Sequence, residues 1–157
     1  MKAITSMYQR LTGVLSGPFF ESIFLLLTRV ALAGIFWRSY QTKVEEGTWL
    51  TISDVQYFIF ENEFAGLPIP SDIAVPMATY AEFLFPILLV VGLASRFSAL
   101  ALMIMGLVIQ IFVFPTADHF FGWAVTVIAL AGVIISRGPG LFSLDAVVAR
   151  LAGPKAA

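Results

Sequence analysis

The sequence predicts an all-α integral membrane protein, a four-helix bundle with amphipathic surface helices at its termini. Hydrophobic residues make up 59% of the chain and charged residues only 12%, whereas soluble domains carry about 25% charged residues. Four apolar segments approach or reach the length that a helix needs to cross a bilayer, at about 20–42, 73–94, 97–114 and 120–136. The 157 residues leave room for little else, so we expect one transmembrane domain over residues 1–157.

Before the first span, the chain predicts a short helix lying on the membrane surface. Apolar side chains recur there at helical spacing: Ile4, Met7, Leu11 and Val14. Such spacing makes one apolar stripe with polar residues around it, and Gly17-Pro18 is a typical helix stop. The first span follows at about 20–42, with Arg29 and Arg38 inside it.

Residues 43–72 are predicted to form an extramembrane loop. Acidic residues dominate it: Glu45, Glu46, Asp54, Glu61, Glu63 and Asp72, against the single Lys43. Ser53 is a suitable N-cap for one short amphipathic helix within this loop. The loop ends in GLPIPSD, whose prolines favour extended or turn backbone.

The remaining connections are short. Only Ser95 and Arg96 separate the second and third spans, so these spans should form a tight antiparallel hairpin. The loop PTADH, residues 115–119, leads into the fourth span, and RGPG ends it. A last helix, SLDAVVARL, has Ser143 as its predicted N-cap.

The distribution of basic residues predicts the orientation. With a cytoplasmic N-terminus, the cytoplasmic side collects Lys2, Arg10, Arg96, Arg137, Arg150 and Lys155, and only Lys43 lies outside. Cytoplasmic loops carry the excess of Lys and Arg. We therefore expect a multi-pass protein of a bacterial inner membrane, with both termini in the cytoplasm and the acidic loop on the periplasmic face.

The spans and their landmarks resemble the DoxX family of small four-helix bacterial membrane proteins over roughly residues 20–148. Four motifs in order carry the resemblance: RVALAGIFWRSYQTK, AEFLFPILLVVGLASRFSALAL, QIFVFPTADHFFGW and RGPGLFSLDAVV. The sequence departs from many members at Arg38-Ser39, where they have a small or glycine-containing pair. The resemblance implies a role in membrane oxidoreductase assemblies, because the family takes its name from subunits of a thiosulfate:quinone oxidoreductase.

Charges inside the spans are the next candidates for function. Glu82 interrupts the second span as Arg29 and Arg38 interrupt the first, and buried charges in membranes usually have partners. If residues 42 and 73 both lie at the outer membrane surface, Glu82 and Arg29 lie roughly 14 and 20 Å below it. We therefore expect an Arg29–Glu82 ion pair, with Arg38–Glu82 as the second choice. The alternative to a functional pair is a structural one that sets helix register.

Polar and aromatic side chains gather in the predicted outer half of the bundle. The candidate ligand pocket comprises Tyr40, Tyr80, Glu82, Gln110, His119 and Trp123. Aromatic walls with a few hydrogen-bonding groups suit a quinone head group. The alternative is an interfacial aromatic belt whose polar groups are satisfied internally.

Composition excludes several kinds of chemistry. The chain has no cysteine and one histidine, so we expect no iron–sulfur cluster or haem held within one chain, and nothing supports nucleic-acid binding. An oxygen-rich metal site at Asp118-His119 competes with a solvated acidic surface, and we assign no metal ligands. No catalytic residue is identified.

Two functions remain open. The first is a small membrane subunit of a quinone-linked oxidoreductase assembly, which supplies an anchor and a candidate part of a quinone site, with other membrane or periplasmic subunits as partners. The cofactor stays unassigned, with quinone as the candidate. The second is a non-enzymatic accessory or a small-molecule or metal-handling protein of a stress-response system. Homo-oligomers fit either function.

Overall fold

The computed structural model describes residues 2–153, and its regular elements in that range are helical. Four helices are long and apolar enough to cross a membrane: Pro18–Gln41, Ser71–Val91, Ser95–Val113 and Ala117–Arg137. The first two are α2 and α4, with the same bounds. The predicted all-α class with four candidate spans is therefore confirmed.

The third and fourth of these helices each contain a π-helical turn. In the third, α5 (Ser95–Val108) continues into η1 (Ile109–Val113). In the fourth, α6 (Ala117–His119) and η2 (Phe120–Ala124) precede α7 (Val125–Arg137). The turn between them is shorter than predicted, because Thr116 accepts a hydrogen bond from the backbone N–H of His119 at 3.2 Å and starts the fourth helix there. Asp118 and His119 thus belong to that helix and not to a loop.

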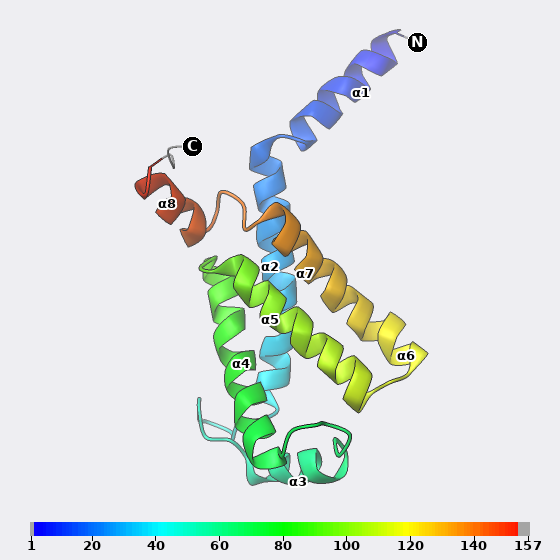
Figure 1. Ribbon diagram of the computed structural model, residues 1–157. Helices are drawn as coiled ribbons and strands as arrows, with labels where there is room; N and C mark the ends of the chain where they lie inside the picture. Colours follow the sequence, from blue (N-terminus) through cyan, green and yellow to red (C-terminus); the bar gives the residue numbers. More distant parts are fainter. Residues whose placement is uncertain (1, 154–157) are drawn as a thin grey trace.

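The helices form two packed pairs that run alternately up and down (Figure 1). α2 packs against α4 and α5 packs against α7, and contacts of α4 with α5 and of α2 with α7 join the pairs. Both described ends of the chain lie at the same end of the bundle as the α4–α5 turn, which we call the terminal end (Figure 1). The opposite end, which we call the α3 end, carries α3 (Asp54–Asn62).

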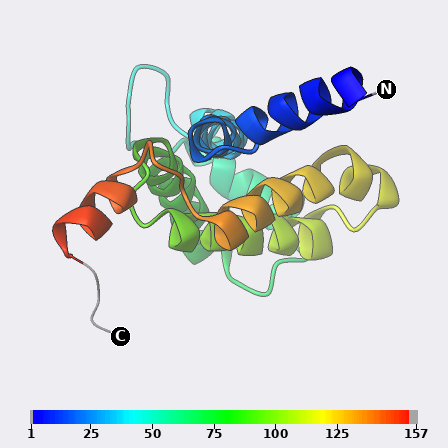
Figure 2. The ribbon, with the colours of Figure 1, turned by 90° about the horizontal axis from the view of Figure 1, so that it is seen from above.

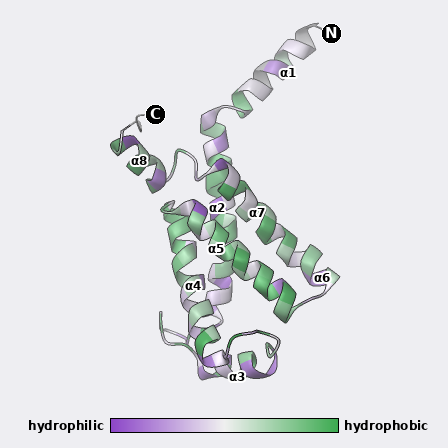
Figure 3. Cartoon of the chain, viewed as in Figure 1, coloured by the Kyte–Doolittle hydropathy of each residue, from purple (hydrophilic) through white to green (hydrophobic). Residues whose placement is uncertain are grey.

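The hydrophobic core joins all four long helices. Its fully buried side chains include Leu32 and Phe36 of α2, Leu89 of α4, Leu102 of α5 and Ile134 of α7. Apolar side chains also cover the outside of the bundle, whereas hydrophilic residues concentrate in α3, in its loops and at the terminal end (Figure 3). An apolar outer surface is what lipid contact requires.

α3 forms where the sequence predicts a short amphipathic helix. Ser53 occupies its N-cap position, although the serine side chain makes no capping hydrogen bond. Phe60 of α3 packs against Ala74 and Val75, which lie in the first turns of α4. The beginning of α4 therefore projects towards α3 and supports it.

The two terminal helices project from the terminal end of the bundle (Figure 1). α1 (Lys2–Leu15) leaves the terminal end at an angle, and α8 (Leu144–Leu151) extends in another direction (Figure 2). Ser143 caps α8 as predicted, since its hydroxyl accepts from the N–H of Ala146 at 3.1 Å. Their placement on the membrane surface stays a prediction, and Lys155 lies outside the described residues.

Candidate functional site

A cavity of about 490 Å³ lies at the α3 end, and we call it the α3-end cavity. Its walls come from α2, α4, α5 and the two π turns, while α3 and the loop after it close one side. Most of the lining is apolar; the polar side chains in it are Ser39, Lys43, Glu82 and His119. Ligand pockets of about 300–1,000 Å³ with mostly apolar walls and a few polar groups are typical of small-molecule sites.

The charged part of the wall is an ion pair between Lys43 and Glu82. The Lys43 Nζ lies 2.7 Å from Glu82 Oε2, and the two side chains are only 10% and 2% exposed. Lys43 Nζ also donates to Ser39 Oγ at 2.8 Å. Removing one partner of such a buried pair typically costs about 3–5 kcal/mol, because the other charge is left without compensation.

The backbone after α2 directs Lys43 inward. The N–H of Lys43 donates to the Tyr40 carbonyl at 2.9 Å, and the Lys43 carbonyl accepts from the N–H of Ser53 at 3.0 Å. An isolated antiparallel bridge pairs Val44 with Ile52 just beyond it. Lys43 therefore follows the end of α2 in a fixed position, and its four-carbon side chain reaches Glu82 of α4.

The predicted Arg29–Glu82 pair is wrong. Glu82 pairs with Lys43, and the second choice, Arg38, is exposed. The prediction assumed that the end of α2 and the beginning of α4 are level at the α3 end. Instead, α4 starts at Ser71 and its first turns pack on α3 beyond the end of α2, which places Glu82 beside the end of α2.

Arg29 is fully buried near the terminal end, where its partners are backbone carbonyls. One guanidinium nitrogen donates to the Leu89 carbonyl at 3.1 Å and the other donates to the Phe142 carbonyl. Leu89 is seven residues beyond Glu82, or about 10 Å along the helix. Arg29 thus joins α2, the end of α4 and the segment before α8, and we assign it a structural role.

Gly92 is required by this arrangement. It has φ +77°, and a Cβ on it would lie 2.2 Å from Nη1 of Arg29 and 2.5 Å from Cβ of Ser143. Nearby, the Asp145 carboxylate accepts from the N–H groups of Ala94 and Ser95 at 2.8 and 2.9 Å. These contacts tie the first turn of α8 to the α4–α5 turn.

His119 of α6 and Trp123 of η2 form another part of the cavity wall. Their ring centroids are 5.2 Å apart, and Phe114 stacks on His119 with centroids 5.0 Å apart. His119 Nδ1 lies 2.6 Å from Gln110 Oε1. Because an amide oxygen only accepts, Nδ1 is the donor here, and Nε2 is the acceptor of the neutral ring.

Three of the six predicted pocket residues line the cavity: Glu82, His119 and Trp123. Gln110 does not line the cavity, but its side chain contacts His119, which does. Tyr40 is buried and donates from its hydroxyl to the Trp49 carbonyl, while Tyr80 is 46% exposed and reaches the Leu50 carbonyl at 3.5 Å. The two tyrosine hydroxyls therefore contact the loop between α2 and α3 and do not line the cavity.

Two features of the site were not predicted from the sequence: the role of Lys43, which was expected to be a loop residue, and the π turns. Ser39 four residues before Lys43 was the available signal, since residues at that spacing share a helix face. The turns η1 and η2 supply Ile109, Val113 and Trp123 to the cavity wall, and π turns within α-helices are frequent at functional sites.

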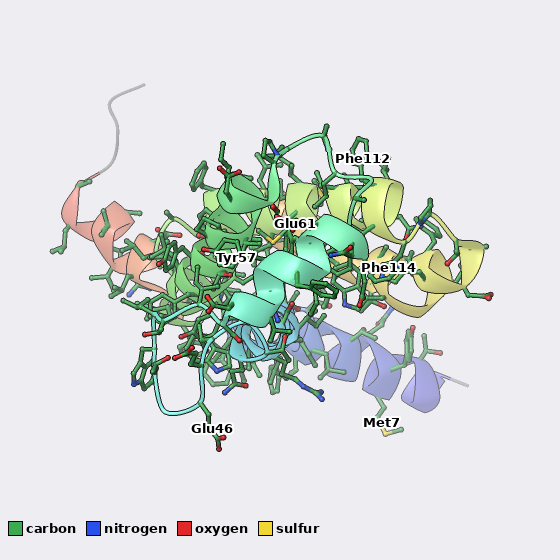
Figure 4. All side chains as sticks on the ribbon, turned by 90° about the horizontal axis from the view of Figure 1, so that it is seen from below. Met7, Glu46, Tyr57, Glu61, Phe112 and Phe114 are labelled. Atoms are coloured by element: carbon green, nitrogen blue, oxygen red, sulfur yellow. The ribbon has the colours of Figure 1, made fainter. Side chains whose placement is uncertain are left out.

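α3 and its following loop cover the cavity from the side of the extramembrane loops. Figure 4 shows α3 crossing the end of the bundle, with Phe112 and Phe114 beyond its C-terminal end and Glu46 projecting away on its loop. Phe64 contacts Phe114 edge to face, with centroids 5.8 Å apart. Within residues 2–153, no three or more His, Cys, Asp or Glu side chains gather as a metal site would require.

Comparison with known proteins identifies the family of the chain. The DoxX family matches residues 24–115, which run from α2 to the turn after η1. The match includes Lys43, Glu82 and Phe114, while His119 and Trp123 lie just beyond it. Neither a curated protein nor a solved structure matches the chain. Since the matched residues are more than half of the chain, this membrane protein belongs to the DoxX family.

Proposed function

We propose that this protein is a small membrane subunit of a quinone-linked oxidoreductase assembly and that it binds a quinone in the α3-end cavity. The observation that carries the proposal is the buried Lys43–Glu82 pair on the wall of a largely apolar cavity. An apolar cavity accommodates the ring and the start of the tail. The ion pair supplies a donor and an acceptor that a saturated lipid chain would not need.

The polar groups match the two forms of a quinone. The Lys43 ammonium has three N–H donors, and a quinone carbonyl accepts hydrogen bonds. The hydroxyl groups of the reduced quinol donate, and the Glu82 carboxylate and the Nε2 of neutral His119 are acceptors. Trp123 offers a ring face for stacking. The chain thereby binds and orients the ring, and Glu82 is positioned to accept a proton from a quinol.

Electrons have to come from a partner in this proposal. The chain has no cysteine, so it offers neither a disulfide nor thiolate ligands for a cluster. We therefore assign the redox centre to another membrane or periplasmic subunit and the quinone-binding wall to this one. The inner membrane, with the terminal end facing the cytoplasm, is the proposed location, since the basic residues gather at that end.

Filling the cavity tests the proposal. Ala78 lines the cavity on α4, and Ala78→Phe should weaken quinone binding in nanodiscs by about tenfold or more, or about 1.4 kcal/mol. Ala129 is exposed on α7, so Ala129→Phe adds the same ring outside the cavity and should leave binding unchanged. Binding is measured as quenching of tryptophan fluorescence. Equal affinity in the two folded variants would remove the cavity as the quinone site.

The second candidate is a non-redox accessory that holds a lipid or another apolar molecule. The mostly apolar lining favours it. The double variant Lys43→Met/Glu82→Met separates the two functions, because it removes both charges and keeps similar volume. Loss of quinone binding with an intact fold supports the oxidoreductase subunit. Unchanged binding of any apolar ligand, quinone included, supports the accessory.

A further inference from the structure

The α3-end cavity is closed towards the extramembrane loops. Phe60, Phe64 and Leu67 of α3 and its following loop line it on that side. This cover is attached at both ends. Gln56 Nε2 donates to the Thr42 carbonyl at 3.1 Å, beside the end of α2.

The other attachment is to η1, where the backbones approach closely. A Cβ on Gly66 would lie 2.5 Å from the Phe112 carbonyl oxygen, so only glycine fits there without a shift. Phe64 also contacts Phe114 at this point. A bulky ligand would have to break these contacts to enter through the cover.

The cavity is open between α4 and α5. Met77 of α4 and Ile104 of α5 both line it, although they are 54% and 51% exposed. The neighbouring lining residues Ala78 and Ala101 are small. α4 and α5 meet at the terminal end and diverge towards the α3 end (Figure 1). Since both helices are candidate spans, this gap faces lipid.

We infer that the ligand enters the α3-end cavity sideways from the membrane, between Met77 and Ile104, with its polar head leading. This inference rests on the proposed function and specifies its substrate as a membrane-dissolved, long-tailed quinone. The head reaches the Lys43–Glu82 pair at the inner wall. The tail stays in the gap and extends into lipid, where it makes the contacts it had before binding.

A reversible seal tests the route. The chain has no cysteine, so Met77→Cys/Ile104→Cys places the only two thiols at the gap. A bifunctional methanethiosulfonate reagent bridges them, and a reductant removes the bridge. The matched control is Val30→Cys/Val91→Cys, an exposed pair that lines a different groove, between α2 and α4.

In nanodiscs, sealing the gap should slow the binding of a long-tailed quinone by about tenfold or more. Reduction should restore the rate, and the bridged control should bind like the unmodified protein. If the sealed protein binds at the original rate while the unsealed protein binds normally, sideways access is wrong and the proposed function stands.

A second readout does not depend on quinone. With Trp37→Phe and Trp49→Phe, Trp123 is the only tryptophan, and it lines the cavity. Lipids brominated on their acyl chains should quench Trp123 less after sealing than before. Unchanged quenching would contradict the opening. If sealing lowers the quenching but the protein binds no quinone, the opening is confirmed and the proposed function is wrong.

Discussion

The Lys43–Glu82 pair makes a quantitative prediction about stability. Glu82→Met leaves the Lys43 ammonium on a wall where its side chain is 10% exposed, and Lys43→Met leaves a carboxylate that is 2% exposed. Each single change should therefore destabilise the fold by about 3–5 kcal/mol. For a chain of this size, 3 kcal/mol corresponds to roughly 6–12 °C in Tm.

The double variant Lys43→Met/Glu82→Met should be much less destabilised than the sum of the single variants. It leaves no unpaired charge, and methionine fills irregular space well. The measurement is thermal unfolding in detergent, analysed as a double-mutant cycle, in which residues in direct contact show interaction energies of about 0.5–3 kcal/mol.

The same cycle with Arg29 in place of Lys43 is the control. Arg29 binds the Leu89 and Phe142 carbonyls and not Glu82, so the effects of Arg29→Met and Glu82→Met should add. Coupling between Arg29 and Glu82, with additivity between Lys43 and Glu82, would refute the arrangement described above and restore the pair that the sequence predicted.

Three further predictions concern other parts of the molecule. Gly92→Ala should destabilise the fold by more than about 1–2 kcal/mol, measured by Tm, because left-handed backbone alone costs that much and the new Cβ would also meet Arg29. Trp123→Ala should weaken quinone binding by about 0.5–1.5 kcal/mol through lost ring contact, measured by equilibrium titration. In intact cells, an impermeant maleimide should label Glu46→Cys and not Leu93→Cys, because these exposed residues lie at opposite ends of the bundle. The reverse labelling would invert the proposed orientation.

The fold was accessible from the sequence because a bilayer imposes a simple length and hydropathy requirement. Four apolar segments met it, and the helix stops and caps around them, such as Ser143 before α8, depend on neighbouring residues only. The start of the fourth helix was misplaced by three residues. Thr116 caps the first turn of this helix. The polar composition of PTADH had led to the prediction of a loop there.

The candidate site was only partly accessible. Helical periodicity placed Glu82, His119 and Trp123 towards the same end of the bundle, and they do line one cavity. Periodicity says which face a residue occupies but not how far one helix slides along another, so the partner of Glu82 was misassigned. The position of α4 along α2 depends on the packing of Ala74 and Val75 against α3. This is a tertiary contact, and no local sequence pattern predicts it.

The two buried charge clusters differ in a way that bears on function. Charges within spans are functional candidates by default, yet the Arg29 guanidinium donates to backbone carbonyls and lies against Gly92. Glu82 borders a cavity. Its own carbonyl also lacks the usual helical hydrogen bond, because Pro86 four residues later has no N–H.

Departures from regular helix therefore concentrate around one of the two clusters. Pro86 follows Glu82 by one turn, and the π turns η1 and η2 form part of the cavity wall near His119. Irregular backbone at membrane depth is tolerated only where protein or a cavity satisfies its polar groups. At the terminal end, by contrast, the charged side chains of Arg29 and Asp145 form hydrogen bonds with backbone atoms and hold segments of the chain together. The α3 end thus combines a cavity with an ion pair and a histidine on its wall, and this combination supports the proposed ligand site.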